Sequence, residues 1–229
     1  MCEQFVARSP EPFAIADLWE FAGRLERFGI AGFGWGAAWL TAEGRLAVHR
    51  DVRAFRDDPG REVVGREVTT SLLVHLRRPS KLSTIAMPDT QPFEDPRGRF
   101  AFSHNGDLRD HRTWRDRYGA QGRIHGRADS EVAARWLEDE WDPALPPGLA
   151  FDALHDVLGG AANFALLLPD GTAHHYAGNP ENPVFAFRIG PIRFLSTGIY
   201  SLDRSLFHLV CPDARDRRAV RLGRTASLA

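Results

Sequence analysis

The sequence predicts an α+β fold in which two strand-rich layers pack together and helices lie outside them. Apolar residues alternate with polar ones in short segments of both halves, and apolar residues at helical spacing recur between these segments. Turn residues join neighbouring strands into hairpins. A chain of 229 residues fits one large domain, so we expect residues 1–229 to fold as a single unit. Periodicity alone leaves the order of the layers open.

The first half of the chain combines strands with one helix. Apolar residues at helical spacing between Ile15 and Phe28 predict an amphipathic helix that packs on a sheet. An Ala-Glu-Gly turn around Gly44 joins two short apolar segments into a hairpin. Strands are expected at 4–8, 36–40, 46–49, 71–76 and 99–104.

The second half has the helices first and the strands after them. Helices are expected at 108–118, 130–141 and 151–158, the last of which Gly159 ends. A Pro-Asp-Gly turn then predicts a second hairpin. The strands are expected at 161–168, 172–177, 184–189 and 193–197. Residues 213–229 are polar and rich in arginine, and we expect them to form a loosely ordered tail.

Composition excludes several classes of partner. Lys+Arg 29 against Asp+Glu 30 gives a net charge of −1, so no overall field attracts nucleic acid or an anionic membrane. The arginines between 109 and 127 alternate with acidic residues, which favours a solvated helix face over RNA contact. Neither a membrane-spanning apolar run nor a signal-peptide core is visible. Two distant cysteines suit a reducing compartment, and we expect a cytoplasmic protein.

The most informative residue is Cys2, directly after the initiator methionine. If Met1 is removed, Cys2 carries a thiol and a free α-amine on one residue. A thiol is a weak nucleophile until a base accepts its proton, and an amine that titrates at about 7.7 to 8.0 can do so. Alternatively, Cys2 is an incidental small residue at an exposed terminus.

A second signal is the strand that runs through His104 into Asn105-Gly106. Alone, an Asn-Gly pair after an alternating strand is typical of a hairpin turn. Beside a terminal cysteine it has a chemical use, because an Asn amide and a Gly backbone N–H can together stabilise the oxyanion formed in acyl transfer.

With these residues in place, the chain resembles the class II glutamine amidotransferases, which are N-terminal-nucleophile hydrolases. The resemblance rests on an ordered set of motifs over the first 131 residues: Cys2, Gly34-Trp35-Gly36, His75-Leu76-Arg77, Thr90-Gln91-Pro92-Phe93, His104-Asn105-Gly106 and Ala128-Asp129-Ser130-Glu131. It implies a four-layer αββα sandwich of two mainly antiparallel sheets flanked by helices. Three positions depart from the family pattern, namely Ser80, Leu82 and Asp89.

The resemblance also implies roles for individual residues. Cys2 would attack the side-chain carboxamide of glutamine with its own amine as base, and Asn105 and Gly106 would form the oxyanion hole. Arg77 would hold the substrate α-carboxylate, for which a planar guanidinium is suited. Asp129 would pair with the α-ammonium group. For Arg77 a surface arginine is the alternative, and for Asp129 a helix N-cap.

Three further residues, Trp35, Gly36 and His75, belong to the substrate-binding set that the resemblance implies. Trp35 and His75 are alternatively core or supporting residues, whereas Gly36 would let substrate approach the backbone. We expect no metal and no cofactor. The adjacent His174 and His175 would point to opposite faces of a strand, which is poor geometry for shared metal ligation.

Three functions fit these observations. The first is hydrolysis of glutamine that delivers ammonia to a synthase partner or another acceptor. The second is hydrolysis of a γ-glutamyl amide in a larger metabolite, as in ergothioneine biosynthesis, and a cleft lined by Trp35 or Trp114 would favour it. The third is a non-catalytic binding protein on the same fold. In each case the ligand is a small molecule, and the sequence leaves the oligomeric state open.

Overall fold

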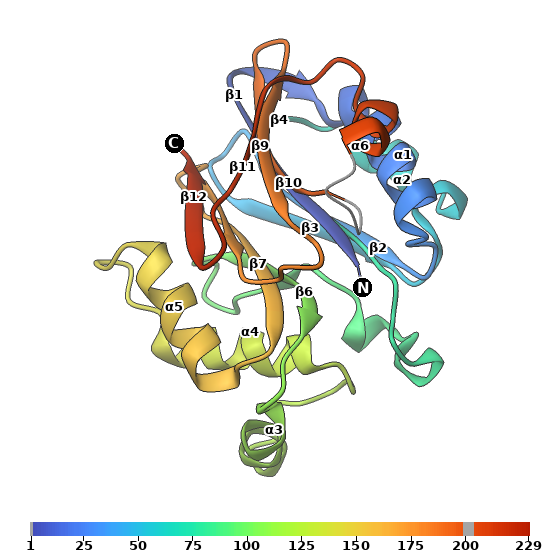
Figure 1. Ribbon diagram of the computed structural model, residues 1–229. Helices are drawn as coiled ribbons and strands as arrows, with labels where there is room; N and C mark the ends of the chain where they lie inside the picture. Colours follow the sequence, from blue (N-terminus) through green and yellow to red (C-terminus); the bar gives the residue numbers. More distant parts are fainter. Residues whose placement is uncertain (1, 199–203) are drawn as a thin grey trace.

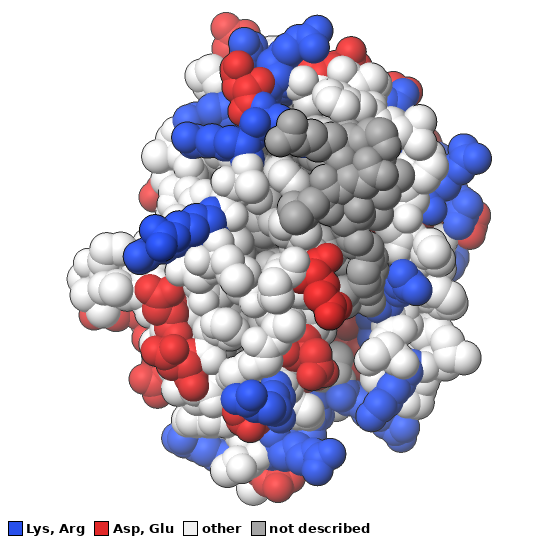
Figure 2. Space-filling view, in the orientation of Figure 1, with Lys and Arg blue, Asp and Glu red and all other residues white. Residues whose placement is uncertain are grey.

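The computed structural model describes residues 2–198 and 204–229, which form two antiparallel sheets packed face to face with helices on both outer sides (Figure 1). This arrangement confirms the predicted four-layer αββα sandwich. Side chains of both signs are spread over the face shown in Figure 2, in keeping with the net charge of −1. None of the helices within the described ranges is long and apolar enough to cross a membrane.

The first sheet has seven strands in the order β11-β9-β10-β1-β4-β2-β3. Their bounds are β1 Glu3–Ala14, β2 Trp35–Leu40, β3 Leu46–Asp51, β4 Val68–Leu76, β9 Val184–Ile189, β10 Ile192–Thr197 and β11 Arg215–Ala219. Its outer face is covered by α1 Trp19–Gly29, α2 Gly60–Gly65 and α6 Arg204–Val210. Short 3₁₀ turns lie at Ile15–Leu18 and Phe55–Asp57.

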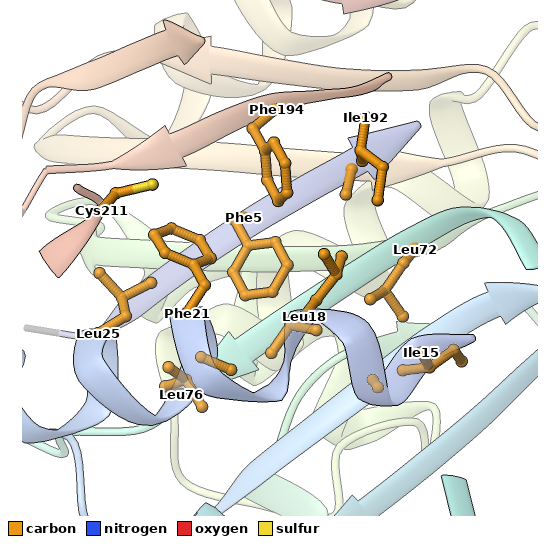
Figure 3. Packing of buried hydrophobic residues seen from close by; sticks show 14 of the residues in the cluster. Phe5, Ile15, Leu18, Phe21, Leu25, Leu72, Leu76, Ile192, Phe194 and Cys211 are labelled. Atoms are coloured by element: carbon orange, nitrogen blue, oxygen red, sulfur yellow. The ribbon is translucent and has the colours of Figure 1, made fainter. Parts of the chain in front are cut away.

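Aromatic rings fill the space between this sheet and α1 (Figure 3). The ring of Phe21 on α1 lies 5.1 Å from that of Phe5 on β1 and 5.5 Å from that of Phe194 on β10, both in edge contacts. Rings at such separations add to the stabilisation from apolar burial. The helical spacing of Leu18, Phe21 and Leu25 therefore fixes α1 across the strand that carries the N-terminus.

The second sheet has five strands in the order β12-β8-β7-β6-β5. Their bounds are β5 Phe93–Glu94, β6 Ala101–Asp107, β7 Ala161–Leu167, β8 Ala173–Ala177 and β12 Arg224–Leu228. On its outer side lie α4 Asp129–Glu140 and α5 Pro147–Leu158, with α3 His111–Ala120 packed on α4. Two more 3₁₀ turns, Leu82–Thr84 and Met87–Asp89, lie in the loop after β4.

Alternation along β1 determines what meets between the sheets. Phe5 and Ala7 point to the helical layer, whereas Val6 packs in the apolar core between the two sheets. Gln4 shares the face of Val6, and its Oε1 accepts a hydrogen bond of 2.8 Å from the Ser103 hydroxyl on β6. Side chains of a strand alternate between faces. Cys2, two residues before Gln4, therefore projects into the same space.

The C-terminal segment differs from the expected loose tail. Residues 215–219 pair with β9 and residues 224–228 pair with β8, so both strands extend existing sheets. Arginine-rich composition conceals this structure, because an arginine side chain can cover apolar surface while its charge stays in water. The guanidinium of Arg217 lies 4.6 Å from the ring centre of Phe207 and 5.1 Å from that of Phe185.

Candidate active site

A cavity of about 410 Å³ opens where Cys2, directly before β1, meets the end of β6 and the start of α4. Four of the predicted site residues line it: Cys2, Arg77, Gly106 and Asp129. A larger and shallower depression of about 650 Å³ between α1 and α6 contains none of the predicted residues. The structure therefore gathers residues that are up to 127 positions apart in the sequence at one cavity.

Cys2 lies at the mouth of the space between the sheets. Its Sγ is 3.4 Å from the backbone N of Arg78, which donates to it, and 3.7 Å from the Arg78 carbonyl oxygen. Burial raises the pKa of the thiol, while the Arg78 N–H and the charge of Arg77 act in the opposite direction. The thiol thus needs a base to become a nucleophile. Met1, whose removal would free the α-amine of Cys2, lies outside the described residues.

Asn105 is completely buried on β6, and neither atom of its side-chain amide has a hydrogen-bond partner among the described residues. The strand continues past it, because Asn105 and Gly106 pair with Asn163 and Ala162 of β7. The hairpin-turn alternative is therefore wrong. Asn105 lies two residues after Ser103 on the same face of β6, and Ser103 bonds to Gln4 of β1. The Asn105 amide therefore lies toward the end of β1 that follows Cys2.

Gly106 lines the cavity with its backbone. Its φ of 133° is in a region that favours glycine, and a Cβ here would lie 1.9 Å from the carbonyl oxygen of Ala161. No larger residue fits without moving β7. The sequence pair Asn105-Gly106 thus places an unpartnered amide next to a backbone segment that approaches the cavity directly.

Arg77 follows β4 directly and is held by its own backbone. Its N–H donates to Gly34 O at 2.9 Å, and its carbonyl oxygen accepts from Phe33 N at 3.1 Å. The side chain is 3% exposed, which excludes the surface-arginine alternative, and Nη1 has no hydrogen-bond partner among the described residues. Burial lowers the pKa of the guanidinium, and Cys2 and Asp89 partly offset this. A buried guanidinium with an unused N–H can donate a hydrogen bond to an anion bound in the cavity.

Asp129 is the first residue of α4, and the N-cap is Ala128. Its Oδ1 accepts from Ser130 N at 2.9 Å, and its Oδ2 accepts from Leu108 N at 2.8 Å. The sequence offered Asp129 as the N-cap of this helix, but the structure places it at the first helical position, one residue after the N-cap. Two backbone N–H groups from separate segments fix the orientation of this carboxylate at the cavity wall.

Asp89 is a residue of the cavity wall whose role the motifs did not indicate. It is 1% exposed, and its Oδ1 accepts from the backbone N of Arg127 at 2.5 Å and from that of Ala128 at 2.7 Å. It therefore connects the loop after β4 to the segment that leads into Asp129. The departure from the family pattern at this position was the one available signal.

Gln91 is a second such residue. Its Oε1 accepts from the backbone N of His104 at 2.6 Å, and its Nε2 donates to His104 O and to the Ser130 hydroxyl, both at 3.1 Å. The side-chain amide thus pairs with β6 in the manner of a strand, beyond the end of β5. The bond from Gln91 to Pro92 is cis.

Three predicted substrate-binding residues, Trp35, Gly36 and His75, do not line the cavity. Trp35 lies in the core beneath α1, where its Nε1 donates to Asp58 at 3.0 Å. At Gly36 a Cβ would lie 2.3 Å from Gln91 O, so this glycine makes room for the loop that carries Gln91. Trp114, the other candidate for an aromatic cleft, stacks on Tyr118 of α3 instead.

The buried histidines around the site are neutral. His75 is inaccessible, and burial lowers its pKa to about 3, with the Arg77 charge as a second cause. Burial also lowers the pKa of His104, whose Nδ1 is 2.9 Å from the Ser130 hydroxyl. Among residues 2–198 and 204–229, no three His, Cys, Asp or Glu side chains gather as metal ligands.

Comparison with known proteins finds one matching family model and several solved structures of similar fold. A family model described as class-II glutamine amidotransferases matches residues 1–177. Two solved structures are similar with a TM-score of 0.74. One is the glutamine phosphoribosylpyrophosphate amidotransferase of B. subtilis complexed with ADP and GMP (17% identity, 99% of this chain and 47% of that chain). The other is described as the allosteric regulatory enzyme of purine biosynthesis (16% identity, 99% of this chain and 46% of that chain).

A third structure, a glutamine aminotransferase class-II domain protein from Silicibacter pomeroyi, is similar with a TM-score of 0.63. Its identity is 18% over 98% of this chain and 94% of that chain. The present chain thus spans less than half the length of the first two structures. A search of curated proteins finds no match. At these identities the likeness to solved structures shows the fold.

Proposed function

This chain belongs to the class-II glutamine amidotransferases, and from that premise we propose that it hydrolyses the γ-carboxamide of glutamine through a thioester on Cys2. One observation supports the proposal above the others. Cys2, Arg77, Gly106 and Asp129 line a single cavity, with the unpartnered amide of Asn105 on the adjoining strand position. A nucleophile, one oxyanion donor and two opposite charges then surround one space, and the second oxyanion donor, Asn105, lies next to Gly106 on the same strand.

The chemistry starts with removal of Met1, which frees the α-amine of Cys2. The amine accepts the thiol proton, and the sulfur attacks the carboxamide carbon. The oxygen of that carbon becomes an oxyanion, to which the Asn105 amide and the Gly106 N–H donate. The ammonium group then returns the proton to the substrate nitrogen, ammonia leaves, and a γ-glutamyl thioester remains. Water, deprotonated by the same amine, attacks the thioester, and glutamate is released.

Recognition of the substrate head group falls to two charged side chains. Arg77 lines the cavity and its Nη1 has no hydrogen-bond partner among the described residues, and a guanidinium can donate two parallel hydrogen bonds to the α-carboxylate. Asp129 supplies the charge for the α-ammonium, and the backbone bonds from Leu108 and Ser130 leave it no freedom to turn away. Two fixed opposite charges select a free amino-acid head group.

A second candidate is hydrolysis of a γ-glutamyl amide in a larger metabolite. The volume of about 410 Å³ lies within the range of roughly 300 to 1,000 Å³ typical of pockets for drug-sized ligands. The wall also includes Lys81, Thr84 and Pro180, and it contains no tryptophan. The space therefore favours a substrate that continues beyond the scissile nitrogen, through a polar group rather than an aromatic one.

The fate of the ammonia follows from which substrate is used. With glutamine, an acceptor or a synthase partner would consume the ammonia. With a larger amide, the released amine would itself be the product. In both cases the site binds the same γ-glutamyl head.

The experiment compares glutamate release from glutamine and from a panel of γ-glutamyl amides, using protein whose loss of Met1 is confirmed by mass spectrometry. Activity should disappear in Cys2→Ala and persist in Cys211→Ala, the matched control, because Cys211 is buried in the core under α1. A glutamine-mimicking electrophile should label Cys2 alone. Absence of both turnover and labelling in the processed protein would instead support a non-catalytic binding protein.

A further inference from the structure

The turn between β8 and β9 places a buried asparagine against the first residues of β1. Asn182 is completely buried, and its Nδ2 lies 3.4 Å from the carbonyl oxygen of Cys2 and 3.4 Å from Oε1 of Glu3. The backbone carbonyl oxygen of Asn182 accepts from Nδ2 of Asn163 at 2.7 Å. This asparagine is therefore held from the second sheet while its side chain contacts the residue that carries the proposed nucleophile.

Besides its bond to Asn182, Asn163 holds the backbone of the turn. Its Oδ1 accepts from the backbone N of Gly178 at 3.0 Å and from that of Asn179 at 3.1 Å. Its partner across the strands is Asn105 of β6. The turn is thus anchored at the same register position that carries the proposed oxyanion donor, which leaves the side chain of Asn182 little freedom to move away from Cys2.

The side-chain oxygen of Asn182 is buried and has no hydrogen-bond donor among the described residues. A buried acceptor without a donor has lost its hydrogen bonds to water and gained none in return, so native proteins seldom keep one without a reason. Here the neighbouring nitrogen of the same amide already contacts Cys2. A donor that becomes available on Cys2 would satisfy the oxygen.

The direction of β1 shows where that donor would be. Gln4 turns both of its backbone groups toward β10, because its N–H donates to the Thr197 hydroxyl at 3.0 Å and its carbonyl oxygen accepts from the same hydroxyl at 3.2 Å. Backbone groups two residues apart in a strand point the same way. The nitrogen of Cys2 therefore points to the side on which Asn182 contacts the Cys2 carbonyl oxygen.

We propose that Asn182 is a positioning residue that holds the free α-amine of Cys2, with Oδ1 accepting an N–H of the amine while Nδ2 holds the Cys2 carbonyl oxygen. This inference rests on the proposed function. A peptide nitrogen has one hydrogen, whereas a free amine has two and an ammonium has three. The donor that Asn182 lacks thus appears when Met1 is removed, and the bond would turn the amine lone pair toward Sγ.

A bond from the amine to an amide oxygen stabilises the ammonium form more than the neutral form, so it raises the pKa of the amine. Loss of the acceptor should lower that pKa, and a carboxylate in its place should raise it. Other charged or titratable groups that face this end of β1 are constant in this comparison: Glu3 on β1, His75, Arg77 and Arg78 on and after β4, His104 and Asp107 on β6, Asp129 on α4, and Glu181 in the turn.

The test is the pH dependence of kcat/KM for glutamine or the best γ-glutamyl amide in the processed parent, Asn182→Leu and Asn182→Asp. The acidic limb of this pH profile reports the pKa of the α-amine in the free enzyme. The limb should move to lower pH in Asn182→Leu and to higher pH in Asn182→Asp, because the two variants shift the pKa of the amine in opposite directions. We expect kcat of Asn182→Leu to fall by about 10²-fold, the lower range for losing a positioned base, with KM unchanged. Asn182→Asp, which keeps an acceptor, should be the faster variant above its limb.

A merely structural role of Asn182 would lower activity in both variants without opposite shifts of the limb. An acidic limb that stays with the parent in both variants therefore overturns the inference, while hydrolysis by the parent leaves the proposed function standing. If the processed parent neither hydrolyses nor is labelled at Cys2, both fail together. If Asn182→Leu does not fold, Asn182→Ala takes its place, since it also lacks the acceptor and its acidic limb should likewise move to lower pH.

Discussion

The Asp89 carboxylate lies where a side chain at position 126 would begin. A Cβ on Gly126 would be 2.1 Å from Oδ1 of Asp89, the same oxygen that accepts from the backbone N–H groups of Arg127 and Ala128. Gly126 thus lets one buried carboxylate approach the chain closely enough to hold two successive N–H groups. The segment so fixed ends at Asp129, so this contact positions a charge at the cavity wall.

The first prediction concerns this contact. Asp89→Ala should leave two buried N–H groups unsatisfied, at about 1–3 kcal/mol each, and let the segment before Asp129 relax. We expect a lower free energy of unfolding in urea and a raised KM for the γ-glutamyl substrate. Asp89→Asn, which keeps one acceptor oxygen, should stay close to the parent. Equal KM values in all three proteins would show that Asp89 does not position Asp129.

The second prediction concerns Asn105. Asn105→Ala should lower kcat by about 10² to 10³, the usual loss for one oxyanion donor, with little change in KM. Its amide has no partner that the substitution would orphan, so the folded state should persist. The measurement is steady-state turnover of processed protein together with thermal denaturation. Unchanged turnover would remove Asn105 from the oxyanion hole.

The third prediction concerns Arg77. Arg77→Ala should chiefly raise KM, because the α-carboxylate would lose its partner in both ground and transition states. Arg77→Lys should recover only part of the binding, since an ammonium lacks the planar pair of donors. A substrate analogue without the α-carboxylate supplies the control. Arg77→Ala should not change the KM for that analogue, and a similar loss for both compounds would assign Arg77 a structural role.

The fold was largely predictable because the central strands are short apolar segments and the first helix presents one apolar face. Residues 4–8 lie in β1, and the helical spacing from Ile15 to Phe28 corresponds to the 3₁₀ turn Ile15–Leu18 followed by α1. Residues 215–219 and 224–228 escaped prediction, since most of their side chains are polar and their stability comes from pairing with β9 and β8. Short apolar periodicity cannot indicate a strand that contributes mainly backbone hydrogen bonds.

The site was predictable only where a motif residue could be given a role, which Gln91 was not although it lies in a motif. Cys2, Arg77, Gly106 and Asp129 came from the motifs, and the structure brings them to one cavity. Asp89 and Gln91 act on backbone groups 38 and 13 residues away, and Asn182 contacts a residue 180 positions earlier. These contacts depend on how distant segments pack together, which the spacing of residue types along the chain does not encode.

The fourth prediction concerns stability in acid. Burial lowers the pKa of His75 to about 3 and that of His175 to about 4, from an ordinary value of 6.5. Each ring is then neutral in the folded state, while the unfolded chain binds a proton below pH 6.5. The contribution of each histidine is fully present above pH 6.5 and declines as pH falls toward the folded value. At pH 5 this loss is about 2 kcal/mol for each ring.

Urea denaturation at pH 7 and pH 5 measures this loss as a fall in the free energy of unfolding. His75→Phe should shrink the difference between the two pH values by about 2 kcal/mol, because it removes one of the two rings. His208→Phe is the control, because that residue lies on α6 and is exposed, so its substitution should leave the difference unchanged. Should His75→Phe show the full parental difference, the ring would have to be protonated in the folded state. A cation would then lie beside Arg77, and the attraction of this pocket for a substrate carboxylate would have to be reconsidered.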